Sequence, residues 1–489
     1  MTQTDKARKE RTFYDLAIVN GTVVTEGGVR VGDVAVVGER ISAFGPPGSL
    51  VVGAARVLDA SGLLVLPGGV DPHVHYELEA LGARSESADS SVAALHGGTT
   101  SVIDFAFAVP PGGALAAVAE RRAVFEGRMA PDWGLHVILA GEVPFETLEE
   151  IPELVRGGVP TVKTMTTYGW MCDDGYRFGV MCAVAEAGGL SVIHAEDDEI
   201  ARFLTRKFVR EGKTHGAYVA QTRPALVEEA AIRRALLLAE RSGCALYVLH
   251  VAAGAGAVAI GEARARGLSV YGETLTPYLS FTQEALWEPE RGLLFNNYPV
   301  LKEQADQDVL WEAIVDDRLQ VVSSDHFLIT AADRMSRMGV TVEDLQCGQA
   351  GVEMRLAVLY TLGVVAGRLS LERLVELVAT NPAKLMGLYP RKGVLAVGSD
   401  ADVVLFDPSR RWTVALPELH MASDYNCWEG WELHGRARTV LRRGEVVIED
   451  GRLVGSTRGG RFLERSLPRE VVSAPLDRSR TSAAASGVA

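Results

Sequence analysis

The strongest constraint on the fold is a regular alternation of short apolar segments with Ala-, Leu- and Glu-rich amphipathic segments from residue 69 to about residue 389. The apolar segments predict buried parallel strands, and the segments between them predict crossover helices. About eight such repeats over some three hundred residues favour a closed parallel barrel over an open sheet. After a first strand that leads into Val70, the expected strands lie at 100–105, 135–139, 162–165, 190–194, 245–250, 268–273 and 319–325.

Both ends of the chain have a different pattern. Residues 14–65 read as short strands of a small antiparallel unit separated by turns, and a strand-rich pattern returns near residue 393. We therefore expect an α/β protein with a TIM-like (β/α)8 barrel and a small β-sandwich formed from the N- and C-terminal segments. The predicted units are 1–68 and 391–455 for the sandwich, 69–390 for the barrel, and 456–489 for a tail that is mobile or contacts a neighbouring subunit.

Charge and composition exclude several classes of protein. The net charge of −14 argues against binding to nucleic acid or to anionic lipid. No apolar run is long enough to span a bilayer, and the charged N-terminal segment does not resemble a secretory signal. The 5 cysteines are scattered, which fits free thiols in a reducing cytoplasm. These features predict a cytoplasmic protein that binds neither nucleic acid nor a membrane.

Residues able to bind metal lie at the carboxyl ends of the predicted strands, which meet at one mouth of a parallel barrel. His73 and His75 alternate along an extended segment, so that their side chains share a face. Alone, this pair is equally compatible with surface histidines at a strand end. The full set is difficult to explain without a metal site, and it consists of His73, His75, Lys163, His194, His250 and Asp325.

Lys163 lies within an apolar strand, where a buried ammonium is costly. It could extend its amine to the surface or form a salt bridge. Alternatively, a desolvated amine loses its proton readily and can react with carbon dioxide to give a carbamate. Such a carbamate is a two-oxygen anion that can bridge two divalent ions. Four imidazoles, one carboxylate and one carbamate would then offset part of the charge of two metal ions.

Several motifs together resemble the dihydropyrimidinase/D-hydantoinase branch of the amidohydrolase superfamily, the cyclic amidohydrolases. The resemblance covers about residues 14–455. The motifs are VDPHVH at 70–75, GGTTSVIDF at 97–105, KTMTTY at 163–168, IHAE at 193–196, LHV at 249–251, SDH at 324–326, NPAK at 381–384 and GSDAD at 398–402.

The resemblance implies a binuclear zinc centre. His73, His75 and Asp325 would hold one ion, His194 and His250 would hold the other, and carboxylated Lys163 would bridge them. Asp325 would also carry a proton to the leaving nitrogen of the substrate. Tyr168 matches the family tyrosine that donates a hydrogen bond to the substrate carbonyl, although a packed core tyrosine is the alternative. The family also implies a homotetramer.

Two departures from the family pattern fall on substrate recognition. Tyr298 stands where the branch usually has a serine that contacts the ring amide, and Asn297 precedes it. Cys347 stands where an asparagine contacts the substrate. Dihydropyrimidines are therefore doubtful substrates, and 5-substituted or aryl hydantoins are favoured. Trp170 and Met171 follow Tyr168 on the loop that shapes the pocket for the exocyclic substituent, or they pack in the core.

Other activities remain open at this point. An allantoinase or a cyclic imide or lactam hydrolase fits the same metal ligands. A dihydroorotase usually has an arginine where this chain has Glu77. A non-catalytic scaffold of the same fold is disfavoured because every ligand position is filled. A mononuclear deaminase would not need Lys163.

Overall fold

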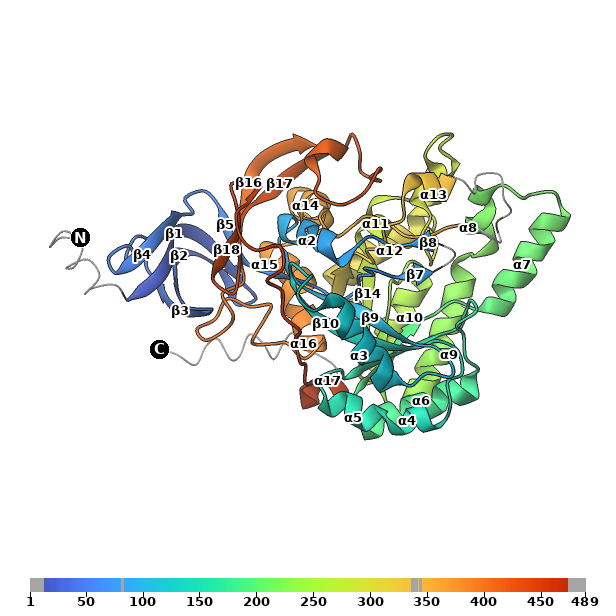
Figure 1. The fold of residues 1–489 in the computed structure, drawn as a ribbon. Helices are drawn as coiled ribbons and strands as arrows, with labels where there is room; N and C mark the ends of the chain where they lie inside the picture. The colour runs from blue at the N-terminus through green and yellow to red at the C-terminus, as the bar shows by residue number, and fades with distance from the viewer. Residues whose placement is uncertain (1–12, 81–82, 336–341, 343–344, 474–489) are drawn as a thin grey trace.

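The computed structural model describes residues 13–80, 83–335, 342 and 345–473. Two sheets organise this part of the chain, an eight-stranded parallel barrel and a nine-stranded mixed sheet. In Figure 1 the mixed sheet lies at the left, where blue N-terminal strands adjoin red C-terminal strands, and the barrel with its helices lies at the right. This arrangement confirms the predicted fold class of a (β/α)8 barrel with a small β unit built from both ends of the chain.

The barrel strands pair in parallel in the order β6, β9, β10, β11, β12, β13, β14, β15. Their bounds are β6 Gly69–Asp71, β9 Thr99–Ala108, β10 Asp132–Leu139, β11 Thr161–Met165, β12 Leu190–His194, β13 Ala245–Val248, β14 Val270–Leu275 and β15 Val321–Ser323. A parallel bridge between Val74 and His326 joins the segments that follow the first and last strands. The backbone N–H of His75 donates to the carbonyl of His326 at 2.7 Å, so the barrel closes beside the His-x-His segment.

Helices cover the outside of the barrel, as the crossover rule requires. In α9 (Ala225–Ser242) the buried residues Val227, Ala231 and Ile232 recur at helical spacing, and Gly243 ends the helix with a φ of 69°. The other main helices are α2 Val92–His96, α3 Ala114–Phe125, α5 Ile151–Arg156, α6 Asp174–Glu186, α7 Asp198–Arg210, α10 Gly254–Ala265, α12 Gln304–Val315, α14 Arg355–Leu359, α15 Leu371–Val375 and α16 Asn381–Leu385.

The mixed sheet has the order β19, β18, β17, β16, β5, β1, β2, β3, with β4 also paired to β1. Its strands are β1 Tyr14–Thr25, β2 Gly28–Val37, β3 Arg40–Gly45, β4 Ala54–Asp59, β5 Leu64–Pro67, β16 Val403–Thr413, β17 Glu432–Arg442, β18 Glu445–Glu449 and β19 Arg452–Leu453. The expectation of a purely antiparallel N-terminal unit is wrong. Because β1 is long, β4 and β5 both pair with it in parallel, along different parts of its length. The apolar run before Pro67 also belongs to this sheet rather than to the barrel, since β5 pairs with β16.

The described part of the tail is packed on the barrel, and the expectation that the tail contacts a neighbouring subunit stays a prediction. Residues 456–473 lie against the barrel of the same chain and end in α17 (Arg469–Ser473). The backbone N–H of Leu463 donates to the carbonyl of Trp133 at 2.7 Å, and both side chains are buried. Apolar burial and backbone pairing therefore hold this segment in place. Residues 474–489 lie outside the described part, and the exact domain boundaries stay a prediction.

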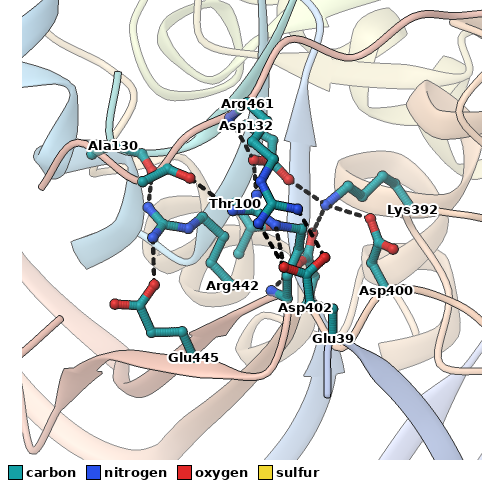
Figure 2. Close-up of polar contacts among 12 residues, drawn as sticks. Glu39, Thr100, Ala130, Asp132, Lys392, Asp400, Asp402, Arg442, Glu445 and Arg461 are labelled. Atoms are coloured by element: carbon teal, nitrogen blue, oxygen red, sulfur yellow. Dashed lines mark hydrogen bonds and ion pairs between the residues drawn. The ribbon is translucent and has the colours of Figure 1, made fainter. Parts of the chain in front are cut away.

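A buried ionic cluster joins the two sheets and the tail (Figure 2). Its centre is Lys392, which is 1% exposed. Three carboxylate oxygens surround the Lys392 Nζ at 2.6, 2.9 and 2.7 Å, those of Asp132, Asp400 and Asp402. Arg443 pairs with Asp132 as well, and we call these five residues the junction cluster. The backbone N–H of Arg461 also donates to Asp132 at 2.9 Å, which ties the tail to the barrel.

Candidate metal centre and substrate cavity

The carboxyl ends of the barrel strands surround one cavity with an empty volume of about 620 Å³. The ten residues predicted to bind metal or to contact the substrate all line it, although they come from segments far apart in the chain. They are His73, His75, Lys163, Tyr168, His194, His250, Asn297, Tyr298, Asp325 and Cys347. We call the six metal-capable residues among them the ligand cluster, which consists of His73, His75, Lys163, His194, His250 and Asp325.

His73, His75 and Asp325 converge on one point. Their candidate ligand atoms all lie within 4.8 Å of one another. The Nε2 atoms of His73 and His75 lie 3.1 and 3.3 Å from Asp325 Oδ1. His250 lies next to this group, because its ring centroid is 5.3 Å from that of His73 and 4.5 Å from that of His194. Four imidazoles therefore form a continuous rim around the carboxylate.

The protonation states suit metal binding. Burial lowers the pKa values of His73 and His250 well below the ordinary histidine value, so both rings are neutral near pH 7. Burial alone would raise the pKa of Asp325, but its contacts with the His73 and His75 rings hold it well below its usual range. His73 Nε2, His75 Nδ1 and His250 Nδ1 are buried without a hydrogen-bond partner among the described residues. Imidazoles with free nitrogens beside a carboxylate are a donor set that fits a divalent ion.

Two buried glutamates orient the histidine rings. His73 Nδ1 donates to Glu273 Oε1 at 2.6 Å, and His194 Nε2 donates to Glu196 Oε2 at 2.9 Å. With these carboxylates as acceptors, Nε2 of His73 and Nδ1 of His194 are left free to bind metal. Burial raises the pKa of Glu273 to about 8, and a cation bound at His73 would favour its ionised form.

Sequence reasoning did not assign a role to either glutamate. Glu196 follows His194 by two residues within the IHAE motif, and Glu273 ends a predicted strand at the barrel mouth. Position at a strand end is the signal that could have found both.

Lys163 reaches into the same cavity from β11 and is 4% exposed. Burial lowers the pKa of its amine to about 8. Its Nζ lies 4.3 Å from the centroid of the Phe105 ring, and among the described residues no carboxylate lies within the 4.0 Å of an ion pair. The salt-bridge and surface alternatives considered for this residue therefore do not describe its position. The amine is buried and unpaired, as carbamate formation requires.

Three of these residues hold an uncommon backbone conformation. The φ angles of Tyr168, His250 and Asp325 are 65°, 35° and 46°. Non-glycine residues in the left-handed region store strain and gather at functional sites. Tyr168 donates its hydroxyl to Glu196 Oε2 at 3.0 Å, and Arg223 pairs with the other oxygen of Glu196 at 3.1 Å. The tyrosine is thus tethered beside the ligand cluster.

The opposite side of the cavity carries the departures from the family pattern. Asn297 donates to Asp325 Oδ2 at 3.1 Å and holds that carboxylate in place. The Tyr298 ring lies 5.5 Å from the Tyr168 ring, and its hydroxyl donates to the carbonyl of Leu345 at 3.4 Å. Cys347 lines the same wall, and burial raises the pKa of its thiol to about 12. The thiol is therefore neutral.

Apolar side chains complete the cavity. Phe107, Trp170 and Phe327 line it, and the Phe107 and Trp170 rings pack at 5.3 Å. Of the two loop residues expected to shape the pocket, Trp170 lies on its wall, whereas Met171 is 41% exposed and does not line it. An apolar wall opposite a polar floor suits a ring with a bulky apolar substituent.

The fold and this arrangement of ligands define a metal-dependent hydrolase. A model of the amidohydrolase family matches residues 64–447. The chain is 37% identical over 458 residues to a D-hydantoinase from Ralstonia pickettii, an alignment that covers 92% of this chain and 99% of that protein. It is 36% identical to a D-phenylhydantoinase from Escherichia coli O1:K1, covering 83% of this chain and 89% of that protein.

A solved structure shows the same similarity. The dihydropyrimidinase from Brevibacillus agri superimposes with a TM-score of 0.89 at 35% identity, covering 93% of this chain and 99% of that one. The chain therefore belongs to the amidohydrolase family. Among the described residues, no helix combines the length and apolar character needed to cross a membrane.

Proposed function

We propose that this chain is a cyclic amidohydrolase of the hydantoinase type, which hydrolyses a ring amide or imide C–N bond. The observation that carries the proposal is the convergence of four imidazoles, one unpaired lysine and one aspartate on a single cavity. The names of the relatives, D-hydantoinase, D-phenylhydantoinase and dihydropyrimidinase, support the same class of reaction.

Two divalent ions, zinc in the first instance, fit this donor set. His73, His75 and Asp325 would hold one ion, His194 and His250 the other, and carboxylated Lys163 would bridge them. The free ring nitrogens and the unpaired buried amine support this assignment. Bound ions supply Lewis acidity and lower the pKa of water, so that a nucleophile is available at neutral pH.

Asp325 is the proton carrier in this proposal. Its Oδ1 faces His73 and His75, and Asn297 fixes its Oδ2, so the carboxylate has one orientation. It accepts a proton from the attacking water as the water oxygen bonds to the ring carbonyl carbon. It then gives this proton to the ring nitrogen as the C–N bond breaks, and the product is an open-chain acid.

Tyr168 is the donor to the developing oxyanion. The Tyr168 hydroxyl donates to Glu196, so the substrate carbonyl must replace Glu196 as the acceptor. The strained backbone at Tyr168 supports a functional reason for its position. A single such donor contributes on the order of a hundred- to a thousandfold in rate.

The aromatic wall favours a hydantoin with an apolar or aromatic substituent at position 5. Phe107, Trp170 and Phe327 offer apolar surface, and Tyr298 occupies space where the family has a small serine. Asn297, Tyr298 and Cys347 would contact the ring itself. Dihydrouracil, which has no substituent to bury, would gain little from this wall.

A substrate panel tests the proposal. Zinc-loaded protein is assayed with 5-phenylhydantoin, hydantoin, dihydrouracil, allantoin, succinimide and a lactam. We expect 5-phenylhydantoin to have the highest kcat/KM. Preferred turnover of allantoin or of a cyclic imide would move the protein to that activity, and no turnover by protein with full metal content would contradict the enzyme class. A homotetramer and a cytoplasmic location stay predictions, which sedimentation and fractionation can check.

A further inference from the structure

A chain of hydrogen bonds runs beneath the proposed metal site, through the interior of the barrel. Arg465 Nη2 donates to Thr161 Oγ1 at 2.8 Å. Thr161 Oγ1 lies 2.8 Å from His136 Nδ1, and His136 Nε2 lies 2.9 Å from the carbonyl oxygen of Pro72. Thr161 and His136 are fully buried, and Arg465 is 2% exposed. The chain connects the C-terminal tail to the residue that precedes His73.

Each link of this chain has a fixed direction. The carbonyl of Pro72 can only accept, so His136 Nε2 carries the proton and Nδ1 is the acceptor. The hydroxyl of Thr161 must then donate to Nδ1, which leaves its lone pairs for Arg465. Burial and the nearby charge of Arg465 keep the pKa of His136 well below its ordinary value, so the ring is neutral. Arg465 can only donate and the Pro72 carbonyl can only accept, so together they fix the direction of every hydrogen bond between them.

Arg465 is an unusual residue for the floor of a barrel. Its guanidinium also contacts the backbone carbonyls of Leu135 and, at 3.4 Å, Met386, and the Met386 Sδ at 3.9 Å. Among the described residues no carboxylate forms an ion pair with it, although a buried charge normally requires one. Burial lowers the pKa of this guanidinium to about 9. A buried cation that contacts only neutral groups lowers stability, and this cost favours a further role for Arg465.

The far end of the hydrogen-bond chain holds the segment that carries His73 and His75. The Pro72–His73 peptide is held on both sides, because its carbonyl accepts from His136 and its N–H donates to Asp71 Oδ1 at 3.3 Å. Asp71 Oδ1 also accepts the N–H of Ser324 at 3.3 Å, next to Asp325. The Phe105 ring stacks on His136 at 4.7 Å and on His75 at 4.8 Å, so His136 also supports the second histidine.

We propose that Arg465 and His136 are positioning residues, which act through Thr161 and Pro72 to fix the orientation of the His73–His75 segment for metal binding. This inference rests on the proposed function, because it assumes a metal centre at the ligand cluster. The tail is thereby part of the active site's support rather than only a cover for the barrel floor.

A matched pair of variants at Thr161 tests the inference. Thr161→Val keeps the side-chain shape but removes the hydroxyl, whereas Thr161→Ser keeps the hydroxyl. Zinc affinity is measured with zinc alone against a chromophoric chelator in bicarbonate buffer, and the Tm of the metal-free protein is measured in parallel. We expect Thr161→Val to weaken zinc binding about tenfold, at the lower end of the effect of supporting residues on metal affinity. Thr161→Ser should stay within about twofold of the wild type.

Arg465→Met and the double variant Thr161→Val/Arg465→Met test whether both residues act through the same hydrogen-bond chain. If both residues act through one chain, Arg465→Met also weakens zinc binding about tenfold, and the double variant loses no more than either single variant. If the loss of zinc affinity in the double variant equalled the product of the two single losses, a shared route would be contradicted. Unchanged zinc affinity with a lowered Tm, or failure of Thr161→Val to fold, would assign the chain to stability and overturn the proposal. If the wild type itself binds no zinc, the proposed function fails instead.

Discussion

Lys163 and Lys392 are both buried, and their surroundings differ completely. Lys392 in the junction cluster lies within 2.9 Å of three carboxylate oxygens, whereas Lys163 in the ligand cluster faces an aromatic ring with no paired carboxylate among the described residues. Burial alone would lower the pKa of Lys392, but its three carboxylate partners raise it. Burial lowers the pKa of Lys163 to about 8.

The difference separates a structural charge from a reactive one. A buried lysine whose partners are complete stabilises the fold in one protonation state and has no capacity for further chemistry. A buried lysine without partners is destabilising unless something else binds it or modifies it. The same reasoning applies to the histidines with free nitrogens. The following predictions test this distinction, from the largest expected effect to the smallest.

Replacement of Lys163 should abolish activity without harming the fold. We expect Lys163→Met to lower kcat/KM by at least about a thousandfold, because the bridge between the two ions is lost and metal catalysis is worth several kcal/mol. Metal content should fall below two ions per chain, as measured by elemental analysis. The metal-free variant should be at least as stable as metal-free wild type, since an unpaired buried amine has been removed. Full activity with one bound ion would instead support a mononuclear deaminase.

Replacement of Lys392 should have the opposite outcome. Lys392→Met leaves three buried carboxylates facing one another, and we expect a loss of about 3–5 kcal/mol in the free energy of unfolding. Metal content and kcat per folded molecule should be unchanged. Lys213→Met is the control, because Lys213 forms an exposed pair with Glu211 at 2.7 Å and should show no measurable loss. Equal denaturation curves for Lys392→Met and wild type would remove the distinction between the two lysines.

Tyr168→Phe separates chemistry from metal binding within the ligand cluster. The phenyl ring keeps the packing while the donor to the oxyanion is lost, so kcat should fall about a hundred- to a thousandfold with two ions still bound. Tyr176→Phe is the matched control, because the Tyr176 hydroxyl donates to the carbonyl of Val143 at 3.0 Å outside the cavity. A kcat within a fewfold of wild type for Tyr168→Phe would show that Tyr168 only packs.

The two lysines should also differ in their pH dependence. In metal-free protein without carbon dioxide, the folded pKa of Lys163 near 8 lies below its unfolded value of 10.5. The unfolded chain therefore binds more protons between these values, and stability relative to Lys163→Met should rise by about 2 kcal/mol from pH 8 to pH 10. The raised pKa of Lys392 gives a contribution that is constant below the ordinary lysine pKa and is lost only above it. Denaturation at several pH values should show a slope for Lys163 and none for Lys392.

The sequence contains enough information to predict the ligand cluster because its residues mark strand ends. His194 ends an apolar run and Asp325 follows one, and in a parallel barrel those positions meet. The barrel itself was predictable from the same alternation. The small sheet was predictable only in outline, because parallel pairing of β4 and β5 with β1 leaves no local trace in any of these strands.

Partners supplied from distant segments could not be predicted. Glu273 is 200 residues from His73, and Arg465 is 304 residues from Thr161. Lys392, in the loop between α16 and β16, likewise lies 260 residues from its partner Asp132. Ion pairs and hydrogen bonds of this kind depend on three-dimensional packing, which a short sequence window does not contain. For that reason the orienting glutamates and the role of the tail emerged only with the structure.

A crystal structure of protein prepared with zinc and bicarbonate tests the central claim most directly. Anomalous scattering should locate two ions per chain, one among His73, His75 and Asp325 and one between His194 and His250. Electron density at Lys163 should show a carbamate in contact with both ions. A single ion beside an unmodified lysine side chain would contradict the binuclear centre and the distinction between Lys163 and Lys392.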